Sequence, residues 1–114
     1  SVVDDQHGRL TFADDLAAAI AHLVSIGVRF GTYNVTNDGP PRSWFDIAKD
    51  VFKLLDAEGS VTPTSTEDYG GGKDLAPRPS HSTLDLNKLV RSGHSMPDAF
   101  QRLHDYVAHF VAQA

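Results

Sequence analysis

The sequence lacks cysteine and contains no long hydrophobic run. Without cysteine the chain can form no disulfide bond and has no thiolate to act as a nucleophile or metal ligand, and we expect a cytoplasmic protein. No apolar stretch approaches the roughly 20 residues that a membrane-spanning helix requires, so we expect no membrane partner. The chain also has no initial methionine and no signal-peptide pattern, which indicates a piece of a longer protein.

Positive charge is in the minority, with 10 lysines and arginines against 15 acidic residues. The net charge of −5 argues against a nucleic-acid partner, because phosphate backbones are bound by basic surfaces. The six histidines include no pair at metal-ligand spacing, so we predict no metal site. With 40% hydrophobic residues, the 114-residue chain is predicted to form a single globular domain, residues 1–114.

A first helix is predicted over about residues 12–25. Thr11 and Asp14 have the spacing of a capping box, in which a hydroxyl and a carboxylate satisfy free amides at a helix start. Gly27 is expected to end this helix. The residues that recur at helical spacing, and that we expect to be buried, are Leu16, Ile20, Leu23 and Val24.

Three short strands are predicted, at Val2–Val3, 30–36 and 61–65. The second alternates in polarity and is rich in β formers. The third should be an edge strand or a strand end, because Pro63 cannot donate a ladder hydrogen bond.

A second helix is predicted to begin after Ser43, with Asp46 completing a capping box, and to end at Gly59. Its apolar face contains Trp44, Ile47, Ala48, Val51, Phe52 and Leu55. Trp44 could stack on a ligand, but at this spacing a tryptophan is more often part of the core.

The remaining residues predict a long loop over 66–82 and two further helices. One helix is expected over about 84–90, capped by Asp85, and the last from Ser95, with Pro97 in its first turn. The chain is therefore predicted to have an α/β fold, a small three-layer-like unit of about three strands and four helices.

The stretch DDQHGRLTFADDLA, beginning at Asp4, resembles the D-D-Q-x-G-x-P-T-x-x-x-D-L-A segment of dTDP-4-dehydrorhamnose reductases. These enzymes belong to the extended short-chain dehydrogenase/reductase group. Leu10 stands where the family usually has proline. Further similar segments follow in the family's order, so the resemblance extends from Val2 to about Val107. They are the S-W at Ser43, the A-x-R-P beginning at Ala76, the S-x-L-D-x-x-K beginning at Ser82 and the final helix from Pro97.

The resemblance covers only the C-terminal, substrate-side part of such an enzyme, lacking the dinucleotide-binding Rossmann half. It implies a substrate-positioning domain of an NAD(P)H-dependent reductase in dTDP-L-rhamnose biosynthesis, inactive alone, with the missing N-terminal domain as its partner. No catalytic and no cofactor-binding residue is expected in this chain, and either NADPH or NADH is implied for the parent enzyme. Tyr69 and Lys73 have the spacing of the family's catalytic pair, but they lie in a predicted glycine-rich loop and we interpret the match as coincidence.

Six residues are candidates for binding a dTDP-sugar. Arg78, followed by Pro79, supplies a guanidinium suited to a pyrophosphate, and Arg9 is a second candidate. Gln6, Gly8 and Thr11 would shape a sugar-facing turn, although helix capping is the stronger expectation for Thr11.

Two alternative functions are left open. The chain could belong to a non-catalytic member of the same group that binds and regulates a protein partner. It could also be the corresponding domain of another nucleotide-sugar epimerase or dehydratase. A homodimer is compatible with each of these readings.

Overall fold

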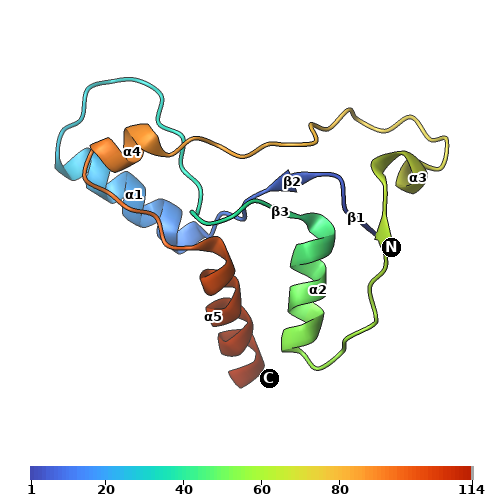
Figure 1. Ribbon diagram of the computed structural model, residues 1–114. Helices are drawn as coiled ribbons and strands as arrows, with labels where there is room; N and C mark the ends of the chain where they lie inside the picture. The colour runs from blue at the N-terminus through green and yellow to red at the C-terminus, as the bar shows by residue number, and fades with distance from the viewer. Residues whose placement is uncertain (114) are drawn as a thin grey trace. The chain divides into compact units, whose positions relative to one another are not determined.

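The computed structural model describes residues 1–113, which form two compact units. The first unit contains Ser1–Gly8, Pro41–Thr83 and the chain from Leu103 onward, and the second contains Arg9–Pro40 and Leu84–Arg102. The described residues form four short strands and five helices, and Figure 1 labels all of them except β4. The predicted α/β class is confirmed, whereas the single domain over 1–114 stays a prediction.

The strands of the first unit make two separate pairs, each two residues long. β1 (Val2–Val3) runs parallel to β4 (Pro63–Thr64), and β2 (His7–Gly8) runs antiparallel to β3 (Arg42–Ser43). Because each ladder has only two residue pairs, other hydrogen bonds must also hold the segments of this unit together.

Pro63 lies in β4 at a position where the ladder does not need a backbone N–H donor. The amides of Val2 and Asp4 donate to the carbonyls of Thr62 and Thr64, on either side of Pro63, at 2.9 Å each. The predicted strand at this proline is thus confirmed in shortened form.

α2 (Trp44–Leu54) has the capping box expected from the sequence. The Ser43 hydroxyl accepts from the amide of Asp46 at 3.1 Å, and the Asp46 carboxylate accepts from the amide of Ser43 at 3.2 Å. The predicted end at Gly59 is wrong. Asp56 takes the left-handed conformation that ends the helix, with φ of 54°, which aspartate tolerates better than most residues.

The predicted loop over 66–82 begins with a short helix, α3 (Thr66–Gly70), so this prediction is wrong in its first part. The Ser65 hydroxyl accepts from the amide of Asp68 at 3.0 Å and caps the helix. Gly71 ends it in the left-handed conformation.

In the second unit, α1 (Ala13–Ser25) begins without the predicted capping box. The Thr11 hydroxyl is instead hydrogen-bonded to the hydroxyl of Thr36, at 2.8 Å. The N-cap residue is Phe12, and its amide donates to the side-chain oxygen of Asn37 at 2.8 Å. A residue distant in the sequence therefore takes part in the start of this helix.

The core of the second unit lies between α1, α4 (Asn87–Arg91) and the segment before α5 (Ala99–Ala112). Its buried residues are Ala19, Leu86, Leu89 and Met96, with Leu23 and Val35 packed against them. α5 begins later than predicted, and the Asp98 carboxylate accepts from the amide of Gln101 at its start. The predicted cap at Asp85 is partly right, because its carboxylate accepts from the Asn87 amide although Leu86 is the N-cap residue.

Two predictions for this unit are wrong, one about a strand and one about the buried face of α1. The segment 30–36 is not a strand, because no backbone ladder joins it to another segment within residues 1–113. Ile20 and Val24, expected in the core, are 52% and 76% exposed. With Ala13 and Ala17 they form an apolar face of α1 on the side away from the buried Ala19.

Asn37 is the fully buried polar residue that joins three segments of the second unit. Its side-chain NH₂ donates to the carboxylate of Asp15 at 2.7 Å and to the carbonyl of Pro97 at 3.2 Å. Because its carbonyl oxygen accepts from Phe12, both ends of the amide are satisfied.

Asn37→Ala is predicted to destabilise the chain by about 1–3 kcal/mol, because it removes the buried hydrogen bonds that join Phe12, Asp15 and Pro97. Urea unfolding should measure this loss against Asn34→Ala, since Asn34 is exposed. Equal stabilities of the two variants would contradict the role given to Asn37.

Candidate functional site

The first unit contains a cavity of about 480 Å³. Residues of the β1 strand, α2, α3 and the following loop line it. They are Ser1, Val2, Val3, Gln6, Trp44, Thr66, Tyr69, Leu75, Ala76 and Arg78. This volume is in the range of small-molecule binding pockets, about 300–1,000 Å³.

Backbone hydrogen bonds to His7 hold the segment that carries Arg78 and Pro79. The amide of His7 donates to the carbonyl of Ser80 at 2.7 Å, and its carbonyl accepts from the amide of Ser82 at 2.9 Å. The rings of His7 and His81 also stack, with centroids 5.0 Å apart. Arg78, two residues before Ser80, is thereby fixed near the turn that contains Gln6.

Gly8 lies against Ser82 in this arrangement. A Cβ atom at position 8 would lie 2.9 Å from the Ser82 hydroxyl oxygen, the end of a small side chain that can rotate away. Gly8 does not line the cavity among the described residues, and a substrate-binding role for it stays a prediction.

A carboxylate holds α3 at the cavity wall. Both oxygens of Asp5 accept from the amide of Thr66, at 3.0 and 2.9 Å, and one also accepts from its hydroxyl. The Gln6 side-chain NH₂ donates to the same hydroxyl at 3.1 Å. The Thr66 hydroxyl and amide hydrogen bonds lower the pKa of Asp5 below its ordinary value of 3.8.

Arg78 combines accessibility with freedom from protein acceptors. Within the described residues its guanidinium has no hydrogen bond or ion pair, and it lines the cavity. Pro79, the next residue, is exposed and does not line the cavity in residues 1–113. A free guanidinium in a cavity wall is suited to a phosphate or carboxylate ligand.

The cavity wall also contains two large aromatic side chains that the sequence did not assign to it. Trp44, expected in the core, is 53% exposed and lines the cavity, which corrects that expectation. Tyr69 lies in α3 and lines it as well. Lys73 comes after the end of α3, so Tyr69 and Lys73 do not share a helix.

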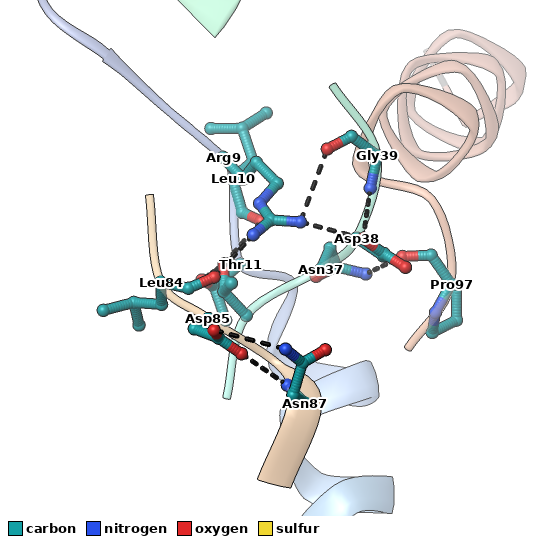
Figure 2. Close-up of polar contacts among 11 residues, drawn as sticks. Arg9, Leu10, Thr11, Asn37, Asp38, Gly39, Leu84, Asp85, Asn87 and Pro97 are labelled. Atoms are coloured by element: carbon teal, nitrogen blue, oxygen red, sulfur yellow. Dashed lines mark hydrogen bonds and ion pairs between the residues drawn. The ribbon is translucent and has the colours of Figure 1, made fainter. Parts of the chain in front are cut away.

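Arg9 and Thr11 belong to the second unit, where Figure 2 shows their polar surroundings. The guanidinium of Arg9 is paired with the carboxylate of Asp38 at 2.8 Å and also donates to the carbonyls of Leu84 and Gly39. Its side chain is only 10% exposed. Arg9 thus already joins three segments of the protein, and a substrate contact for Arg9 or Thr11 stays a prediction.

The described residues contain no cluster of three or more His, Asp or Glu side chains that could hold a metal ion. Within them no helix is long and apolar enough to span a membrane. Gly70, Gly71 and Gly72 lie at the end of a helix, whereas a dinucleotide-binding turn places glycines between a strand and the start of a helix. These glycines therefore do not fit a nicotinamide cofactor.

Thr66 is a further residue of this site that the sequence analysis missed. Its signal was the sequence Ser65-Thr66-Glu67-Asp68, which has capping-box spacing and places Thr66 at a helix start. Its pairing with Asp5 could not be read from the sequence, because 61 positions separate the two residues.

A cavity with aromatic walls, a half-buried amide and an unpaired guanidinium has the chemistry suited to small anionic ligands that contain a ring. Comparison with known proteins is consistent with this class. Residues 1–112 match the family model described as RmlD substrate binding domain. The chain belongs to this family.

Individual relatives and structures agree with the family. The chain is 35% identical over 112 residues to a dTDP-4-dehydrorhamnose reductase of Aggregatibacter actinomycetemcomitans, covering 89% of this chain and 37% of that protein. It is 39% identical over 96 residues to a probable dTDP-4,6-dihydroxy-2-methyloxan-3-one 4-ketoreductase of Streptomyces antibioticus, covering 81% and 30%.

Among solved structures, the dTDP-4-dehydrorhamnose reductase of Bacillus anthracis, in complex with NADP, superposes with a TM-score of 0.78 at 33% identity. That match covers 99% of this chain and 37% of the other. A dTDP-4-dehydrorhamnose reductase from Clostridium acetobutylicum gives 0.80 at 28% identity, covering 96% and 38%. The chain thus spans well under half the length of these proteins.

Acid should release α3 from Asp5. Because the pKa of Asp5 is lowered in the folded state, its stabilising effect is complete above 3.8 and is lost as the pH falls through the lowered pKa. The amide chemical shift of Thr66 should report this step in a pH titration by nuclear magnetic resonance. Asp5→Asn should lack the step, and a midpoint at or above 3.8 in the unmodified chain would contradict the assignment.

Proposed function

We propose that this chain is the substrate-binding part of an NAD(P)H-dependent dTDP-4-dehydrorhamnose reductase, and that its cavity binds the dTDP-sugar. The observation that carries the proposal is the unpaired guanidinium of Arg78 beside Trp44 and Tyr69 in one cavity. The family membership and the names of the relatives support it.

The parts of a nucleotide-sugar correspond to the chemistry of the cavity wall. The pyrophosphate would pair with Arg78, since a guanidinium forms two parallel hydrogen bonds to phosphate oxygens. The base or the hexose would stack on Trp44 or Tyr69. Gln6 would contribute a hydrogen bond, and Gly8 and Pro79 would shape the two backbone segments that hold Gln6 and Arg78.

Hydride transfer itself is assigned to the part of the parent enzyme that this chain does not contain. The NADP complex of the Bacillus anthracis relative supports NADPH as the cofactor of the parent. This chain's role in that enzyme is to bind and orient the sugar in the cytoplasm, without contributing a catalytic residue.

The apolar face of α1 is proposed as the surface that contacts the dinucleotide-binding domain. It exposes Ala13, Ala17, Ile20 and Val24 along one side of the helix. The segment 30–36, which has no ladder within residues 1–113, would pair with the same domain. The relatives are more than twice as long as this chain, which leaves room for such a partner.

If the chain instead belongs to a non-catalytic regulatory protein, the apolar face of α1 should contact a separate protein partner. A photoactivatable cross-linker at Val24, in the protein as its cell makes it, should form links within the same polypeptide, to its dinucleotide-binding part. The same group at Ala18, on the other exposed side of α1, should form few links. Links from position 24 to a different polypeptide would favour the regulatory function.

Arg78→Ala is predicted to weaken dTDP binding by roughly tenfold to a hundredfold, because charge-assisted hydrogen bonds to the pyrophosphate are lost. Calorimetric titration of the 114-residue chain should measure this, with Arg91→Ala as the control, since Arg91 is exposed on α4. Trp44, the only tryptophan, gives an independent fluorescence signal. Failure of the unmodified chain to bind dTDP or dTDP-rhamnose would overturn the proposal.

A further inference from the structure

The hydrogen bonds around Thr66 have a fixed direction. An ionised carboxylate can only accept, so the Thr66 hydroxyl must donate its hydrogen to Asp5, at 2.5 Å. The lone pairs of that hydroxyl then remain for Gln6, whose side-chain NH₂ donates to it at 3.1 Å. An aspartate with its ordinary pKa of 3.8 is ionised at neutral pH, and the hydrogen bonds from Thr66 lower the pKa of Asp5 further.

This direction determines which end of the Gln6 amide is available. The amide nitrogen of Gln6 faces Thr66. The carbonyl oxygen Oε1, bonded to the same carbon, therefore points away from Thr66. Oε1 has no partner among residues 1–113 and is not sealed from solvent, while the Gln6 side chain lines the cavity. The cavity therefore offers an oriented acceptor as well as the cation of Arg78.

We propose that Thr66 and Asp5 are positioning residues that orient Gln6 so that its Oε1 accepts a hydrogen bond from the ligand, and that the cavity thereby selects ligands with an N–H or O–H donor at that point. The inference rests on the proposed function and adds to it a source of specificity. A donor-lacking ligand would leave Oε1 facing an unsuitable group in the occupied cavity, which costs affinity.

Three groups of a dTDP-sugar can supply the required donor. They are the imide N3–H of thymine, the 3′-hydroxyl of the deoxyribose and a hydroxyl of the hexose. A thymine methylated at N3 lacks the first, 3′-deoxy-dTDP lacks the second, and dTDP lacks the third. The three sources can therefore be separated with dTDP, N3-methyl-dTDP, 3′-deoxy-dTDP and dTDP-rhamnose as probes.

The experiment measures the dissociation constants of these four probes for the unmodified 114-residue chain and for three variants. Thr66→Val keeps the shape of the side chain but removes the hydroxyl, and Thr66→Ser restores the hydroxyl as the matched control. Gln6→Met removes the amide itself and keeps a similar length. Trp44 fluorescence and thermal unfolding confirm that each variant is folded.

In the unmodified chain, removal of the matching donor should lower affinity by about tenfold, the effect of one well-oriented hydrogen bond. Thr66→Val and Gln6→Met should reduce this discrimination to less than about twofold, and Thr66→Ser should retain it. In the variants, a reduced penalty for N3 methylation identifies thymine as the donor, and a reduced penalty for loss of the 3′-hydroxyl identifies the deoxyribose. A reduced gain from the rhamnosyl group identifies the hexose.

Discrimination that is the same in all four proteins would overturn the inference while leaving the proposed function intact. The same conclusion would follow if Thr66→Ser lost discrimination as fully as Thr66→Val. Absence of binding by the unmodified chain would instead overturn the proposed function and this inference together.

Discussion

The hydrogen bonds from Thr66 to the Asp5 carboxylate hold the wall of the cavity on which the proposed function depends. The neighbouring ladder between β1 and β4 contains only two residue pairs and could not by itself fix the helix that follows. Asp5 attaches the start of α3 to the turn after β1, and the same hydroxyl orients Gln6. A single charged group thus links the local backbone geometry to the chemistry of the site.

In the second unit, the segments are held together by the buried side-chain amide of Asn37 and not by a sheet. Asn37 joins the start of α1 to Asp15 and Pro97, and Arg9 ties Asp38 to Leu84. The outer face of α1 remains apolar and exposed, as expected for a surface that another domain covers. In the proposed function, ligand recognition and attachment to the rest of the enzyme therefore fall to separate units of this chain.

Features that depend on neighbouring residues could be predicted from the sequence, such as the capping box of α2 and the strand end at Pro63. The family resemblance also followed from short motifs, and one of them made Arg78 a candidate, whose role in binding stays a prediction. Features that depend on distant partners could not be predicted. Thr11 and Asp14 have the spacing of a capping box, but Asn37, 25 positions from Phe12, accepts from the amide at the start of α1 instead. Residues 30–36 have the composition of a strand, but within the described residues no neighbouring segment forms the backbone hydrogen bonds that a strand requires.

The most direct test of the account is to follow the side-chain signals of Gln6, Trp44 and Arg78 by nuclear magnetic resonance during titration with dTDP-rhamnose. These residues come from three different parts of the first unit and meet only at the cavity. The account predicts that the Gln6 amide, the Trp44 indole and the Arg78 guanidinium signals shift together and saturate with one dissociation constant. Saturable binding that leaves all three signals unchanged would contradict it.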